Sequence, residues 1–161
     1  MNKNSSEGRI EFGAMPPAVD EILQHSVSLY QHDREAADTG FRNAIALDPT
    51  ALPGYLCLYK TYTYQGRLDE AYRIALSGLE EAARQAGWPS DWQLWTQELV
   101  GGADSQPARF CLYTLKALSF IHLKRKQVAD SRRILAKLDE LGHLEEVGGT
   151  VMADLADALD A

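Results

Sequence analysis

The feature that most constrains the fold is the spacing of large side chains on either side of one glycine, in YLCLYKTYTYQGRLDEAYRIALSGL, residues 55–79. The central Thr-Tyr-Thr-Tyr has the composition of a strand, but both faces of such a strand would carry large residues, so strand alternation fails. A helical spacing fits on both sides of Gly66, which stands where a helix would end. The segment therefore predicts two helices joined by a tight turn.

The wider segment ALDPTALPGYLCLYKTYTYQGRLDEAYRIALSGLEEA, residues 46–82, resembles the tetratricopeptide repeat (TPR). Asp48-Pro49 matches the family's closing Asp-Pro, and a proline at that junction ends one helical hairpin and starts the next. The resemblance implies a stack of helical hairpins. The residues that carry it are Tyr55, Leu58, Tyr62, Gly66, Leu68, Ala71 and Ala75, with Gly78 where the family usually has a small Ala.

Two further hairpins fit the same template, one before this segment (about 18–48) and one after it (about 108–141). The first lacks the family's turn glycine near His32. The third has Lys126 in place of the turn glycine and Ser131 in place of the second-helix alanine. We expect all three hairpins, with the central one at about 52–84, to pack in one TPR-like domain, residues 17–161.

An insert, residues 85–106, separates the second and third hairpins. A helix start at Ser90 or Asp91 would place Trp92, Trp95 and Leu99 on one face of a helix. The pair Gly101-Gly102 would end that helix.

The two ends of the chain differ in character. Residues 1–16 have the composition of a flexible lead-in. In residues 150–160, Thr150 is a candidate N-cap, and Val151, Leu155 and Leu159 form the apolar stripe of a helix that would cap the last hairpin. The sequence thus predicts an all-α, TPR-like helical hairpin solenoid with a Trp-bearing insert and a C-terminal capping helix.

Charge is unevenly distributed along a chain whose net charge is -7. Residues 109–137 carry eight basic residues and one acid, Asp130, so this stretch is +7. A basic segment within an acidic chain indicates either internal neutralisation or an acidic partner. The overall acidity argues against a nucleic-acid partner.

Composition also bounds the cellular context. No apolar run is long enough to cross a membrane, and the first residues have no apolar core of a secretory signal. Cys57 and Cys111 each lie among apolar residues and outside any CxxC pattern, which favours two buried free thiols. We therefore expect a cytoplasmic protein without a membrane partner.

No catalytic or metal-binding pattern is present in the sequence. His25 and His32 are seven residues apart, too far on one helix to chelate one ion, and nothing else nearby completes a metal site. There is no nucleophile elbow, Walker loop or dinucleotide fingerprint. We expect neither an enzyme nor a bound cofactor.

The TPR resemblance implies a concave groove lined by the first helix of each hairpin, where a peptide or helix of a partner binds. Aromatics beside lysines in this groove suit an apolar partner with acidic groups. Only Lys116 fits the carboxylate clamp of TPR co-chaperones, so binding of a chaperone tail is not expected. The groove positions are Leu23, Val27, Tyr30, Leu56, Lys60, Thr63, Tyr64, Tyr113, Lys116, Phe120 and Lys124.

These features predict a non-enzymatic protein–protein interaction module, an adaptor or chaperone that binds a partner segment in the groove. One alternative is a self-associating structural module, a homodimer whose groove is filled by its own insert. Another is a protein similar to the class II chaperones of bacterial type III secretion. The chain also looks like small TPR proteins encoded in bacterial nitrogen-fixation gene clusters.

Overall fold

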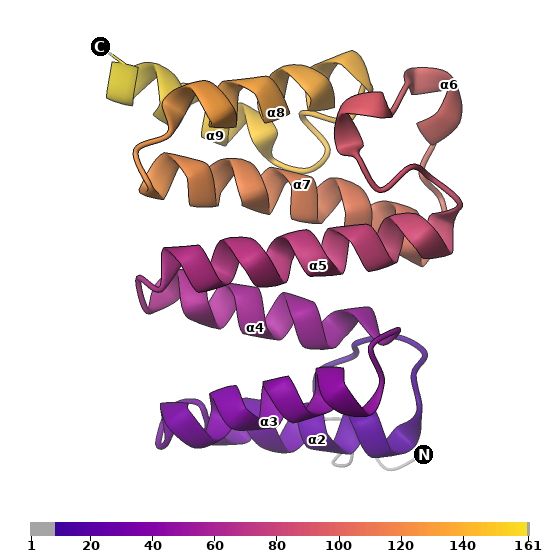
Figure 1. The fold of residues 1–161 in the computed structure, drawn as a ribbon, viewed down its shortest axis with the longest axis vertical. Helices are drawn as coiled ribbons and strands as arrows, with labels where there is room; N and C mark the ends of the chain where they lie inside the picture. Colours follow the sequence, from indigo (N-terminus) through magenta and orange to yellow (C-terminus); the bar gives the residue numbers. More distant parts are fainter. Residues whose placement is uncertain (1–8, 161) are drawn as a thin grey trace. The chain divides into compact units, whose positions relative to one another are not determined.

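The computed structural model describes residues 9–160, and these residues form helices and connecting segments without a strand. The prediction of an all-α fold is confirmed. The chain divides within α4 (Leu52–Tyr64), between Leu58 and Tyr59, into two compact units. Figure 1 shows the order of the helices along the chain.

The first unit is built on the packed pair α2 (Pro17–Leu29) and α3 (Arg34–Leu47). A proline opens α2, where its missing N–H has no helical partner to lose. The Asp33 carboxylate caps α3 by accepting a hydrogen bond from the backbone N–H of Ala36 at 3.1 Å. Apolar positions at helical spacing meet between the helices, with Leu23 and Ala37 completely buried.

Close approach of α2 and α3 depends on Gly40. A Cβ built on Gly40 would lie 1.8 Å from the Oγ of Ser26 on the facing helix. The Ser26 hydroxyl is directed back to the carbonyl oxygen of Ile22 at 2.7 Å, so it does not need a partner on α3. A small residue at position 40 is therefore required by packing.

The segment before α2 lies along that helix. The Gln24 side chain pairs with the backbone of Ile10 in both directions, accepting from its N–H at 3.0 Å and donating to its carbonyl at 2.7 Å. Arg9 adds ion pairs to Asp20 and Glu21. Residues 9–10 of the predicted flexible lead-in are therefore bound to α2. Residues 1–8 lie outside the described chain.

The second unit contains the end of α4, α5 (Leu68–Ala86), α7 (Gln106–Lys124), α8 (Val128–Glu140) and α9 (Gly149–Asp160). Helix α7 is central, because it packs against α5 on one side and against α8 and α9 on the other. Its core is a set of leucine and isoleucine side chains with at most 2 % exposure, namely Leu79, Leu112, Leu115, Leu118, Ile121, Ile134 and Leu138. Removal of this apolar surface from water is the main stabilising contribution.

Helices α4 and α7 end in the same way. The N–H groups of Gly66 and Arg67 return to carbonyls of the last turn of α4, and those of Lys126 and Gln127 return to the last turn of α7, in the pattern of a Schellman motif. The residue at the bend has a left-handed backbone in both cases, with φ of 77° at Gly66 and 63° at Lys126. The predicted tight turn at Gly66 is confirmed.

The insert between α5 and α7 differs from its prediction. It forms a single 3-10 turn, η1 (Trp92–Leu94), followed by the short α6 (Gln97–Val100), and no helix carries Trp92, Trp95 and Leu99 on one face. Trp95 is fully buried, whereas Leu99 is 40 % exposed. The Asp91 carboxylate caps the 3-10 turn, and Gly101 follows the end of α6 as predicted. The extended residues Trp95 and Thr96 interrupt the expected helix.

Helix α9 also departs from its prediction. It begins at Gly149, so Thr150 lies inside the helix and is not its N-cap. The face turned toward the unit contains Ala156, which is completely buried. The predicted packing stripe faces outward instead, because Val151, Leu155 and Leu159 are 60 %, 43 % and 59 % exposed.

Candidate functional site

The second unit contains a cavity of about 250 Å³ formed by the last turns of α4, the middle of α7 and the start of α9. We name it the lysine–aromatic cavity. Sequence reasoning had placed six of its residues in one groove, and the structure brings all six together: Lys60, Thr63, Tyr64, Tyr113, Lys116 and Phe120. The structure adds Tyr59, Ala117, Ile121 and Met152.

Of the four residues that the sequence did not predict, Met152 is the one outside α4 and α7. It lies on α9 between Val151 and Leu155, two residues of the predicted apolar stripe. The buried face of α9 turns Met152 toward α7. Helix α9 therefore supplies a wall of the cavity, in addition to covering α8.

A buried hydrogen bond holds the floor of the cavity. The hydroxyl groups of Tyr59 and Thr114 lie 3.1 Å apart, and both residues are almost completely buried. The Thr63 hydroxyl donates to the carbonyl oxygen of Tyr59 at 2.7 Å. The first of these bonds ties α4 to α7, and the second lies within α4, so the aromatic and lysine side chains stand on two helices that are joined beneath them.

The lysines of the cavity lie over aromatic rings. The ammonium nitrogen of Lys116 is 4.4 Å from the centre of the Tyr113 ring, and that of Lys60 is 5.9 Å from the same ring. Such cation–π contacts hold a lysine in place, and within residues 9–160 neither Lys60 nor Lys116 forms an ion pair with a carboxylate. Elsewhere in the unit, Arg125 is paired with the Asp69 carboxylate at 3.1 Å. The cavity thus combines apolar surface with unneutralised positive charge.

The predicted groove residues of the first unit do not form a comparable cavity. Leu23 is completely buried and belongs to the core, while Val27, Tyr30 and Leu56 are half-buried. The Tyr30 ring is covered by the guanidinium of Arg34 at 5.4 Å. None of the four lines the cavity found between α2 and α3.

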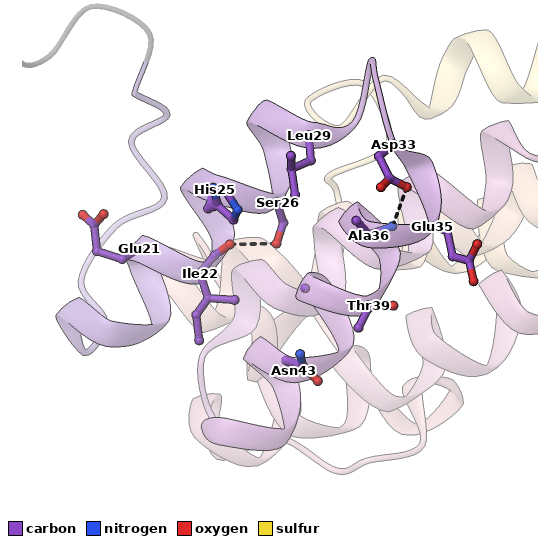
Figure 2. A pocket seen from close by; sticks show the side chains of 11 residues that line it. Glu21, Ile22, His25, Ser26, Leu29, Asp33, Glu35, Ala36, Thr39 and Asn43 are labelled. Carbon is purple, nitrogen blue, oxygen red and sulfur yellow. Dashed lines mark hydrogen bonds between the residues drawn. The ribbon is translucent and has the colours of Figure 1, made fainter.

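This α2–α3 cavity has a volume of about 830 Å³. It is lined by the polar residues Glu21, His25, Asp33 and Glu35 and by apolar residues that include Leu29. Figure 2 shows Glu21 and Glu35 projecting at opposite ends, so these carboxylates do not converge on one point. The Asp33 carboxylate already caps α3. The side chains therefore provide no set of groups that would hold one ion. The spacing of Ile22, His25, Ser26 and Leu29 along one helix face was the sequence signal for this wall.

The insert lies away from the lysine–aromatic cavity. Trp95 stacks edge-on against Trp88 at 5.1 Å, and its indole N–H donates to the carbonyl of Pro89 at 2.7 Å. Lys137 of α8 donates to the Trp95 carbonyl at 2.9 Å. No residue of 85–106 is among those that line the cavity in the described chain.

The His143 side chain is hydrogen-bonded to the C-terminal part of the insert, at Gly101. One ring nitrogen lies 2.9 Å from the carbonyl oxygen of Gly101, and the other lies 2.6 Å from the Glu146 carboxylate. Burial acts to lower the pKa of His143, but the hydrogen bond with Gly101 and the interaction with Glu146 outweigh it, so the pKa is raised. Protonated His143 donates to both oxygens and therefore binds the insert most firmly at low pH.

Metal-ligating side chains do not cluster in the described residues. Within residues 9–160, no group of three or more His, Cys, Asp or Glu side chains could hold a metal ion. Cys57 and Cys111 are free thiols, and burial raises the pKa of Cys111 to about 12, which keeps it protonated and unreactive.

Comparisons with known proteins add no assignment: no protein-family model, no curated protein and no solved structure matches the chain. Over the same described residues, every helix is too short or too polar to traverse a bilayer.

Proposed function

We propose that this chain is a non-enzymatic interaction module, an adaptor or chaperone built of TPR-like hairpins, that binds a segment of a partner protein in the lysine–aromatic cavity. The cavity has a hydrogen-bonded floor and long lysine and aromatic side chains around it, a combination suited to holding a peptide or helix. Residues far apart in the sequence form it, on three different helices.

The exposure of Tyr64 carries the proposal. This side chain is 77 % exposed at the edge of the cavity, and Tyr113 beside it is 41 % exposed. Large aromatic side chains are enriched at the centres of protein interfaces, where burial in a partner removes their apolar surface from water. Two exposed tyrosines next to two lysines form such a centre.

The position of the insert bears on the alternative of a module whose groove is filled by its own insert. Within the insert, the Trp95 ring packs against Trp88, and the Trp95 carbonyl accepts a hydrogen bond from Lys137. This arrangement favours a cavity that is open to a partner.

A capture experiment from the native host tests the proposal. Wild-type protein and the Tyr64→Ala variant are used as bait, with Leu94→Ala as the matched control, because Leu94 is 62 % exposed but lies in the insert. We expect Tyr64→Ala to lose the partner roughly tenfold or more at an unchanged melting temperature, as for an interface hot spot. Equal capture by wild type and Tyr64→Ala would overturn the proposal.

A further inference from the structure

A second cavity continues the lysine–aromatic cavity along α9. It measures about 530 Å³ and lies between the end of α7, the start of α8 and the end of α9. Both cavities include Phe120, so they meet at this side chain. The outward leucines of α9, Leu155 and Leu159, form one wall of the second cavity. We name the combined surface the lysine trough.

All charged side chains that line the lysine trough are positive. They are Lys60 and Lys116 in the first cavity and Lys124 and Lys126 in the second, and no Asp or Glu of the described residues lines either one. Lys124 lies over the Phe120 ring at 5.2 Å. The four lysines form no ion pair with a carboxylate in residues 9–160, in a chain whose net charge is -7. The trough therefore has a charge opposite to that of the whole protein.

The backbone of Lys126 is a separate observation that points to the same end of the trough. Its φ of 63° lies in the left-handed region, which costs a non-glycine residue about 1–2 kcal/mol. The equivalent turn between α4 and α5 has a glycine at this place. Strained residues concentrate where their side chains are used, and Lys126 is an exposed residue that lines the second cavity.

We propose that the lysine trough binds an acidic amphipathic segment of a partner protein, with its apolar side chains against Phe120, Leu155 and Leu159 and its carboxylates over the lysines. This inference rests on the proposed function and specifies the chemistry of the partner. Charge complementarity selects the acidic segment, because apolar surface alone would accept segments of any charge.

Selection from a random peptide library displayed on phage tests the inference. Wild-type protein is one bait, the double variant Lys124→Gln/Lys126→Gln is the second, and Arg73→Gln, an exposed charge on α5 outside the trough, is the matched control. We expect wild type and Arg73→Gln to enrich peptides in which Asp or Glu alternates with apolar residues. The enriched peptide should bind the double variant roughly tenfold more weakly, consistent with two lost, partly exposed charge pairs.

Each other outcome has a defined meaning. Neutral or basic peptides that lose binding in Tyr64→Ala would overturn the acidic partner and keep the proposed function. A bait that enriches no peptide and captures no host protein would overturn both. Competition by a single-stranded oligonucleotide at lower concentration than the acidic peptide would assign the trough to nucleic acid instead. A concentration-dependent dimer that dissociates in the double lysine variant would assign it to the acidic α9 of a second copy.

Single variants separate the charge of Lys126 from its backbone. Asparagine tolerates the left-handed conformation, so Lys126→Asn should weaken the acidic peptide without loss of stability. Lys126→Arg should bind the acidic peptide as the wild type does, because arginine keeps the positive charge. Equal binding by wild type, Lys126→Asn and Lys126→Arg would show that the strained lysine has no part in recognition.

Discussion

The turn after α4 and the turn after α7 have the same backbone and different residues. In both, two N–H groups return to the carbonyls of the preceding helix, at 2.8–3.1 Å. The bend residue is Gly66 in one and Lys126 in the other. The small buried residue on the following helix is Ala71 in one and Ser131 in the other.

The side chains that connect each turn to the preceding helix also differ in chemistry. The guanidinium of Arg67 stacks on Tyr62 at 4.2 Å, whereas Gln127 hydrogen-bonds to the ring of His122 at 2.8 Å. Backbone hydrogen bonds therefore define the turn, and the glycine affects how stable it is. The second turn retains a lysine in an unfavourable conformation, at the mouth of the lysine trough.

The largest effect is expected from placing a serine at Ala71 of the second hairpin, the position that Ser131 occupies in the third. Ala71 is completely buried, so Ala71→Ser places a hydroxyl where water cannot reach it. We expect the free energy of unfolding to fall by about 1–3 kcal/mol, measured by urea denaturation. Ala75→Gly, at the next buried small position of the same helix, serves as a comparison in which packing and helix propensity are lost but no polar group is buried. Wild-type stability in Ala71→Ser would mean that the hydroxyl bonds to a carbonyl of its own helix.

Exchange of the glycine should have the next largest effect. Gly66→Ala places a residue with a side chain in the left-handed region. Nothing lies within 4 Å of the added Cβ, so the substitution acts through backbone strain and not through a steric clash. We expect a loss of about 1–2 kcal/mol. Gly66→Asn, which tolerates this conformation better, should lose less. An equal loss in both variants would contradict the assignment of the effect to backbone strain.

The reverse change at the second turn should stabilise the protein. Lys126→Gly removes the strain of the left-handed lysine and adds some freedom to the unfolded chain, so we expect a net gain of about 0.5–1 kcal/mol. The same variant should bind the acidic peptide more weakly. A gain in stability with unchanged peptide binding would separate the strain from the proposed recognition, and a loss of stability would show that Lys126 makes stabilising contacts.

The smallest effect is expected at Ser131. Its hydroxyl is buried without a hydrogen-bond partner in the described residues, whereas the buried Ser119 donates to the carbonyl of Lys116 at 2.5 Å. Ser131→Ala should increase the free energy of unfolding by no more than about 1 kcal/mol. Thermal denaturation should therefore show a slightly higher melting temperature. Ser119→Ala is the matched control and should lower stability, because it removes a satisfied hydroxyl. A decrease in both variants would show that Ser131 has a partner in solution.

Much of the candidate site could be predicted from sequence because it lies on two long helices. Lys60, Tyr64, Lys116 and Phe120 were expected in one groove from the TPR resemblance, which places groove residues on the first helix of each hairpin, and all four line the cavity. Met152 could not be found in this way, because its orientation depends on how α9 packs on α7. The cavity between α2 and α3 was missed because it follows from the close crossing of Gly40 and Ser26.

The helices, their turns and most of the core are encoded locally, because they follow from the spacing of apolar residues and from short-range backbone hydrogen bonds. Tertiary structure decided the conformation of the insert, where Trp95 gains more by burial against Trp88 and Lys137 than a continued helix would provide. It also decided which face of α9 is buried. The small Ala156 permits close packing of α9 on the unit, and this leaves the larger Leu155 and Leu159 at the lysine trough.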